Sequence, residues 1–321
     1  MVKRSLILLL LLLIMQIKLS AQQVPSFTQY MDNLFILNPA AAGAFGITTF
    51  NLLSRQQLVG IDGAPSSNTF SVDGRMLKKH WLFKKLFSGS GEGTSSGSVG
   101  QGGLVYTDHN GLIRRTGIQY AYAYHISVGT TQISGGISAQ VYQMQVNRSA
   151  AIGTSDYDPL LLSYGNIWVP DFNVGIFLTH RAFFAGISAN SLSESALKLG
   201  VSSQNNYSLL RYYYVVAGYI FTTDRYKIEP SVLYKTTGQL GNEVDFTTRV
   251  TYRNSFWIGL GGRSNGDIMA MVGVIVKRWY IGYAFDYGTT TFKLTSYGTH
   301  EISISYKLGN SAKRLKWMER Y

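Results

Sequence analysis

The chain has 321 residues, of which only 14% are charged and 13% are aromatic, with 34 glycines, 22 tyrosines and no cysteine. Soluble globular domains carry about 25% charged residues, so this composition argues against an ordinary soluble protein. The lack of cysteine excludes a disulfide framework and a thiol nucleophile. The formal charge of +12 comes mostly from scattered basic residues rather than from a dense basic patch.

Residues 1–21 have the pattern of a secretory signal peptide. Lys3 and Arg4 start the segment, residues 6–15 form an apolar run, and small residues end it. The run is shorter than the roughly 20 residues of a transmembrane helix, and no later stretch reaches that length. We expect cleavage after export, and the loss of three basic residues with this segment, Lys18 among them, leaves a charge of +9. Lipid headgroups, lipopolysaccharide phosphates or an acidic protein are then better partners than nucleic acid.

Residues 22–46 are too irregular for a spanning strand, although they are rich in aromatic residues and contain proline. We predict an ordered plug or clasp, in or under the rest of the protein, that engages a partner. A flexible periplasmic leader is the alternative interpretation.

Residues 47–310 alternate apolar and polar side chains with the period of two that is typical of β-strands. In 117–126, for example, one face is formed by isoleucine and tyrosine and the other by small and polar residues. A soluble β-sandwich shows the same alternation with its apolar face inward. The tyrosine content and the long strands favour an all-β fold, a transmembrane antiparallel β-barrel of about fourteen strands. The predicted strands are 47–57, 66–76, 98–108, 114–127, 131–146, 170–179, 182–189, 211–223, 225–236, 243–252, 254–263, 267–276, 278–287 and 298–308.

Charged residues in the polar phase of these strands are candidates for lining the lumen. They could border a path for a polypeptide or a small solute, or they could pair across strands in a packed interior that transports nothing. These candidates are Glu229, Lys235, Glu243, Asp245, Arg249, Asp286, Glu301 and Lys307.

Three long connections, 77–97, 147–169 and 190–210, are expected on the cell exterior, where long barrel loops carry recognition. After the last strand, residues 311–321 form a basic tail that contains Trp317. We expect this tail on the periplasmic side, either in contact with a partner or lipid headgroups, or solvated.

No catalytic or metal-binding pattern is present in the sequence. The five histidines are scattered without an HExxH spacing, and the glycine-rich stretch 88–103 lacks the Gly-Lys-Ser/Thr ending of a phosphate-binding loop. The sequence therefore predicts no catalytic residue, no metal site and no cofactor.

Near the start of the predicted mature chain, residues 29–33 read QYMDN, 38–43 read NPAAAG, 54–58 read SRQQL and 61–65 read IDGAP. These segments resemble the PorP/SprF family of outer-membrane proteins, which belong to the type IX secretion and gliding apparatus of Bacteroidetes. Two positions depart from the family pattern: Ala41 replaces a tyrosine and Leu58 replaces a tryptophan. Further similar segments follow in order at 170–172, 186–188, 229–231, 257–260, 282–286 and 300–302.

The resemblance implies a role in secretion, anchoring or surface display rather than catalysis. Expected partners are a secreted cell-surface protein with a C-terminal sorting domain, such as a gliding adhesin, or periplasmic components of the secretion machinery. A porin or hydrophobic-solute transporter is the alternative function, and an outer-membrane enzyme such as a phospholipase is a third. The candidates for partner contact are Phe27, Tyr30, Asn38, Pro39, Gly43, Arg55 and Trp317.

Overall fold

The computed structural model describes residues 26–75, 96–111, 113–146, 167–193, 196–198, 206–208, 211–238, 241–289 and 296–309. The predicted signal peptide, the basic tail with Trp317 and most of the connection 147–169 lie outside these residues. No helix in the described part is long and apolar enough to cross a membrane. The elements are the 3-10 turns η1 (Tyr30–Asp32), η2 (Leu34–Ile36) and η3 (Pro39–Ala41), and the strands β1 (Thr48–Gln56), β2 (Ser66–Arg75), β3 (Ser96–Asn110), β4 (Ile113–Val128), β5 (Thr131–Val146), β6 (Ile167–His180), β7 (Phe183–Asn190), β8 (Ala196–Lys198), β9 (Asn206–Ser208), β10 (Tyr212–Tyr219), β11 (Phe221–Thr222), β12 (Tyr226–Thr236), β13 (Asn242–Tyr252), β14 (Phe256–Arg263), β15 (Asp267–Val276), β16 (Trp279–Gly288) and β17 (Thr299–Leu308).

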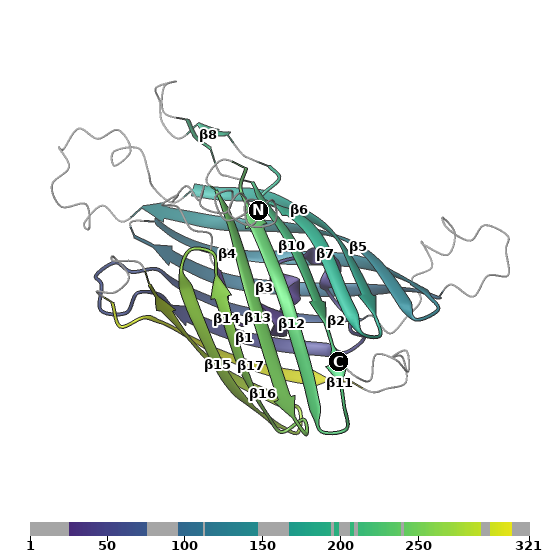
Figure 1. Ribbon diagram of the computed structural model, residues 1–321. Helices are drawn as coiled ribbons and strands as arrows, with labels where there is room; N and C mark the ends of the chain where they lie inside the picture. The colour runs from purple at the N-terminus through teal and green to yellow at the C-terminus, as the bar shows by residue number, and fades with distance from the viewer. Residues whose placement is uncertain are drawn as a thin grey trace, which may run out of the picture.

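The strands form a closed antiparallel barrel of 14 strands with one extra strand, as the sequence predicts (Figure 1). Neighbours in sequence pair as hairpins, and β1 pairs with β17 from Thr48 opposite Leu308 onward. The ring is completed by β10 against β12. The short strands β8 and β9 form a separate hairpin within the predicted connection 190–210.

The predicted strand 211–223 is interrupted, and the interruption separates β10 from β11. Both parts pair with β12 in one register, because Gly218 lies opposite Ser231 and Phe221 opposite Ile228. In that register the gap faces Pro230, which has no backbone N–H to donate to a neighbouring strand. The extra strand is therefore the end of β10 beyond this break.

Apolar side chains cover the outside of the barrel, and polar or small side chains point inward. On β4, Ile118 and Tyr120 are 57% and 54% exposed, whereas Gln119 is 8% exposed and Ala121 is fully buried. A soluble sandwich would bury the apolar face, so the alternation has the orientation of a membrane barrel whose closed strand pairing satisfies its backbone.

One end of the barrel has short turns, at 129–130, 181–182, 223–225, 253–255 and 277–278. Short turns are typical of the periplasmic end, and longer loops of the extracellular end. Residues 76–95 lie outside the described part of the chain, but the strand ends that flank them contradict the expectation that all three long connections start from the same end. Successive hairpins alternate between the two ends, and the chain leaves β2 after Arg75 and rejoins at Ser96, at the end where β1 begins.

Candidate functional site

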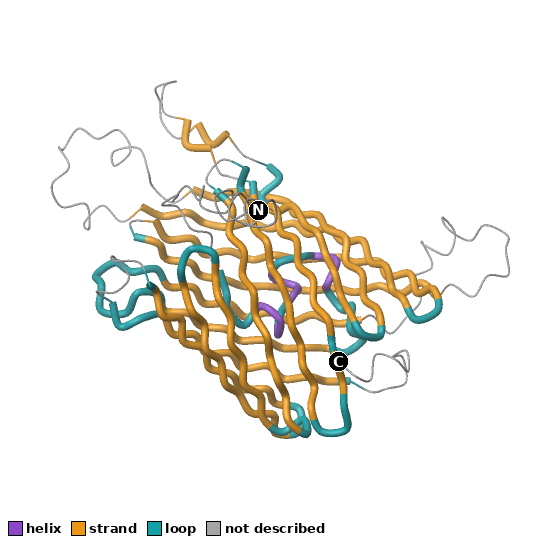
Figure 2. Tube along the Cα trace, viewed as in Figure 1, coloured by secondary structure: helices purple, strands orange, loops and turns teal. Residues whose placement is uncertain are grey.

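The lumen is occupied by the protein's own residues 26–46, here called the lumen segment (Figure 2). Its first residues lie in the extracellular half, where Ser26 contacts Lys235 near the end of β12. It then crosses to the periplasmic half, where the Gly43 N–H donates to an Asp73 carboxylate oxygen at 2.9 Å. The segment therefore runs through the lumen from one half of the barrel to the other before β1 starts.

A buried arginine and two buried carboxylates bind the start of the lumen segment. Arg55 lies 2.6 Å from Asp286 and 2.9 Å from Glu301, and all three side chains are almost fully buried. The backbone N–H groups of Thr28 and Gln29 each donate to Glu301 at 2.8 Å. Because buried charges need partners, the lumen segment completes the hydrogen bonding of this cluster rather than merely lying beside it.

The charged cluster extends along the lumen wall. Arg263 lies 3.6 Å from Asp286 and 2.9 Å from Asp245, and Lys235 in turn contacts Asp245 and Glu243. Acidic and basic side chains therefore alternate in one unbroken series of ion pairs, which starts at Glu301 on β17 and ends at Lys235 on β12.

A second ionic cluster joins the middle of the lumen segment to the wall. Arg249 lies 2.6 Å from Asp32 of η1 and 3.1 Å from Glu229, which also pairs with Lys227 at 3.0 Å. Lys307 belongs to neither cluster, and its ammonium nitrogen lies 3.9 Å from the centre of the Tyr280 ring.

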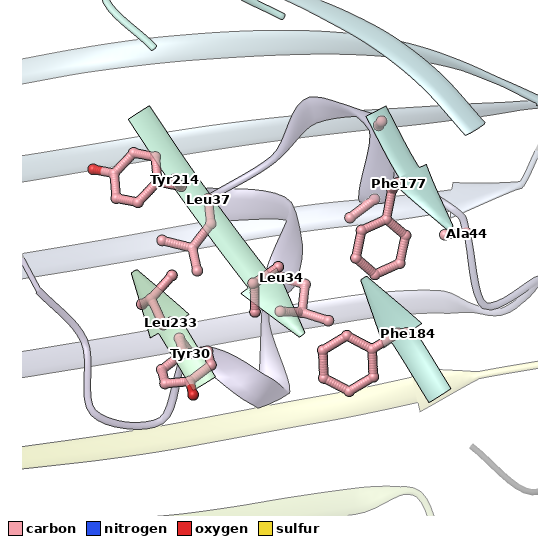
Figure 3. Packing of buried hydrophobic residues seen from close by; sticks show 11 residues of the cluster. Tyr30, Leu34, Leu37, Ala44, Phe177, Phe184, Tyr214 and Leu233 are labelled. Atoms are coloured by element: carbon pink, nitrogen blue, oxygen red, sulfur yellow. The ribbon is translucent and has the colours of Figure 1, made fainter. Parts of the chain in front are cut away.

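Apolar side chains of the lumen segment pack against an inward-facing apolar patch of the barrel wall (Figure 3). Burial of one such leucine or aromatic side chain contributes roughly 1.5–3 kcal/mol. The Tyr30 hydroxyl also hydrogen-bonds Ser231 at 2.8 Å, so its polar end is satisfied. The labelled members of this cluster are Tyr30, Leu34, Leu37 and Ala44 from the segment, and Phe177, Phe184, Tyr214 and Leu233 from the wall.

Asn38 holds the segment to the wall and starts η3 at the same time. Its side-chain oxygen accepts from the Ala40 N–H at 2.9 Å, as helix-capping residues do. Its side-chain nitrogen donates to the carbonyls of Ile176 and Ile187 at 2.9 and 3.0 Å. Pro39, in the next position, suits the first position of a helical turn because it needs no hydrogen-bond acceptor there.

Glycines in the wall allow the backbone of the lumen segment to approach closely. A Cβ at Gly136 would lie 2.4 Å from the Ala40 nitrogen, and one at Gly100 would lie 2.0 Å from the Ala42 carbonyl oxygen. The neighbouring Gly135 has no atom within 4 Å of such a Cβ. The inner surface is therefore shaped to the segment that occupies it.

Of the residues predicted to contact a partner, Phe27, Tyr30, Asn38, Pro39, Gly43 and Arg55 are all buried inside the barrel. The first five lie along the lumen segment in contact with the wall, and Arg55 belongs to β1 of the wall itself. Direct contact with a partner stays a prediction for them, and Trp317 lies outside the described residues.

The eight predicted lumen residues all belong to the inward phase, and seven of them take part in the two ionic clusters. Sequence reasoning missed Arg263 and the contribution of Thr28 and Asp32. Arg263 could have been found, because it continues the inward phase of the predicted strand 254–263. The other two lie in an irregular segment, where no periodicity indicates which way a side chain points.

A cavity of about 150 Å³ lies between the lumen segment and the extracellular halves of the strands. Phe27, Ile36 and Leu37 border it on the segment side. A cavity of this size holds a group about as large as a benzene ring. Its other walls are mixed in character and include Tyr106, Tyr142, Tyr212 and Tyr214 together with Asp108, Arg115, Gln119, Gln140, Asn173 and Asn190.

Within the described residues, no group of three or more His, Asp or Glu side chains is arranged to hold a metal ion. The chemistry that the lumen does offer is ion pairing, hydrogen bonding and apolar contact.

The fold is similar to the CymD monoaromatic hydrocarbon channel, with 13% identity and a TM-score of 0.48 over 89% of this chain and 94% of that chain. It is also similar to Omp33 of Acinetobacter baumannii, with 9% identity and a TM-score of 0.44 over 83% of this chain and 99% of that chain. No curated protein matches in sequence. The family described as type IX secretion system membrane protein PorP/SprF matches residues 19–306, and the chain therefore belongs to the PorP/SprF family.

Proposed function

We propose that this protein is an outer-membrane docking component of the type IX secretion system that assists the secretion, anchoring or display of a partner protein. The family and the membrane barrel support the secretion role. The observation that carries the docking role is the lumen segment, which fills the barrel through two ionic clusters and an apolar cluster. In this proposal, a barrel whose lumen is occupied by its own chain acts by binding at its surface rather than by conducting its substrate.

The partner that fits best is a secreted cell-surface protein with a C-terminal sorting domain, such as a gliding adhesin. Its contact would be at the extracellular mouth, where the cavity beside Phe27 and Tyr212 accepts one ring-sized side chain. A buried aromatic anchor in such a pocket is the usual centre of a protein interface. Periplasmic components of the machinery and the lipids of the outer membrane complete the proposed set of partners.

Site-specific photo-crosslinking in cells tests this proposal. A photoreactive phenylalanine analogue at Tyr212 lies in the cavity, and the same analogue at Ile187, which is 53% exposed on the outer wall, is the matched control. We expect a crosslink from position 212, and none from 187, to a secreted protein that carries a C-terminal sorting domain. Crosslinks to lipid alone from both positions would overturn the proposal.

The porin alternative requires an open lumen. It is supported if the purified wild-type protein shows steady conductance steps in planar bilayers, and it is rejected if the bilayer stays silent.

A further inference from the structure

The short turns at the periplasmic end carry charge of almost one sign. Their charged residues in the described part of the chain are five exposed basic residues and one acidic residue, Asp224. At the extracellular end, the described residues of the connections contain one acidic residue, Asp62, and two basic residues, Lys198 and Arg211. We call the five periplasmic residues the basic arc, and they are Arg181, Arg225, Arg253, Lys277 and Arg278.

The basic arc is continuous around the rim of the barrel. Its turns connect β6 to β7, β11 to β12, β13 to β14 and β15 to β16, which follow one another in the closed ring. The hairpin ends of β13 to β16 lie together at one edge of the barrel in Figure 1. Two of the turns are directly joined, because the Arg253 N–H donates to the Arg225 carbonyl at 2.8 Å. The arc is therefore one surface rather than a set of isolated charges.

Two members of the arc have a backbone conformation that glycine and asparagine adopt more often than lysine and arginine. Lys277 has a φ of +58° and Arg253 a φ of +46°, in the left-handed region that favours glycine and asparagine. Glycine occupies such positions in two other short turns, at Gly111 and Gly129, and Leu58, Ser191 and Asn254 are the other residues besides glycine with a positive φ in the described part of the chain. Basic side chains at 253 and 277 oppose the local backbone preference, and departures of this kind point to function.

An aromatic belt lies just inside the arc on the outer wall. The rings of Tyr252 and Phe256 are 5.3 Å apart and those of Trp279 and Tyr306 are 4.7 Å apart. Aromatic belts mark the boundary between hydrocarbon and headgroups. A strand rises about 3.3 Å per residue, so turn residues one or two positions beyond the belt lie roughly 3–7 Å outside it. The headgroup layer is about 5–8 Å thick, which places the basic arc at the level of the lipid phosphates.

We propose that the basic arc binds the headgroups of anionic phospholipids in the periplasmic leaflet and so sets the depth of the barrel in the membrane. The guanidinium carbon of Arg253 lies 5.3 Å from the centre of the Tyr252 ring, so its charge lies beside the belt. This position fits a lipid phosphate better than the acidic surface of a periplasmic protein. The proposal does not depend on the docking function at the opposite end.

The test compares lipid retention by the full-length protein in mixed micelles that contain phosphatidylglycerol or phosphatidylcholine, measured by native mass spectrometry. The wild type is expected to retain phosphatidylglycerol preferentially. One basic residue near a membrane surface contributes about a fivefold preference for an anionic lipid. The preference for phosphatidylglycerol over phosphatidylcholine is therefore expected to be about 25-fold lower in the double variant R253N/K277N than in the wild type. The charge-preserving variant R253K/K277R is expected to keep the preference.

Thermal unfolding of the same samples separates lost binding from lost folding. Asparagine suits the left-handed turn conformation, so R253N/K277N is expected to be at least as stable as the wild type in neutral detergent. R114Q, at an exposed position near the extracellular end of β4, is the matched control and is expected to leave lipid retention unchanged. Equal retention of the two lipids by the wild type, or unchanged retention in R253N/K277N, would overturn the proposal. The proposal would also be overturned if R253N/K277N kept the lipid preference but lost binding to an acidic periplasmic protein. That result would assign the basic arc to the protein partner.

Discussion

Arg55 shows how one side chain can bind a segment that has little regular structure of its own. It comes from β1, pairs with carboxylates on β16 and β17, and donates to the Thr28 hydroxyl at 2.7 Å. Strand pairing places β1 next to β17, and it places Glu301 directly opposite Arg55. The residue therefore connects the closure of the barrel to the seating of the lumen segment.

Arg55→Met tests this role. It would leave Glu301 without its arginine and Asp286 with only the more distant Arg263, and breaking a buried ion pair in this way costs about 3–5 kcal/mol. Urea unfolding in lipid vesicles should show a loss of that size. Arg114→Met, at an exposed position, should change the unfolding free energy by no more than about 0.5 kcal/mol. Equal effects of the two substitutions would contradict the assignment.

A pair of adjacent glycines provides a second test at this scale. Gly136→Ala places a methyl group 2.4 Å from the Ala40 nitrogen, whereas Gly135→Ala meets no atom within 4 Å. We expect Gly136→Ala to displace the lumen segment and make it sensitive to added protease, and Gly135→Ala to behave as wild type. Protease resistance in both variants would show that the segment adjusts without leaving its site.

At the scale of elements, the lumen segment owes its order to the wall. Its 3-10 turns are each three residues long, and their free carbonyls find partners across the lumen, such as Ser188, which donates to the Leu37 carbonyl at 2.7 Å. Turns this short are not stable in isolation, so residues 26–46 need the closed barrel around them.

Removal of residues 26–46 should open the barrel. The deleted region contributes the apolar and hydrogen-bonding groups that fill the lumen, so planar bilayers should show conductance steps with the variant and none with the wild type. If the deletion variant does not fold, Gly136→Ala provides a second route to the displaced state, with Gly135→Ala as its control. Silent bilayers from a folded deletion variant would mean that other residues close the lumen.

At the scale of the whole molecule, docking lets the lumen segment stay in place, whereas transport through the lumen requires the segment to move. Asn33 of the segment donates to Ser71 of β2 at 2.7 Å, and the sequence contains no cysteine. A disulfide between Asn33→Cys and Ser71→Cys would therefore be the only one in the protein, and it would lock the segment in place. If the protein acts by docking, surface display of the partner should be the same with and without reductant. Display that requires reductant would show that the segment must move.

The barrel could be predicted from the sequence because each strand of a membrane barrel carries its own sequence signal. Alternation of side chains, low charge and the abundance of tyrosine belong to every strand separately, so they predict fourteen strands and their inward faces before any contact is known. The ends of the strands could be predicted less well from the sequence. The break beside Pro230 and the end of the barrel at which β2 finishes depend on which strands become neighbours.

The sequence by itself determined the membrane barrel, the family and the inward phase of residues such as Glu301 and Arg249. It did not determine where residues 26–46 lie or how their side chains are paired, because an irregular segment has no period from which orientation can be read. Contacts such as that between Thr28 and Glu301 join residues 273 positions apart in the chain. Only closure of the barrel brings such residues together, and only the folded structure shows that residues 26–46 occupy the lumen and that one rim carries basic turns.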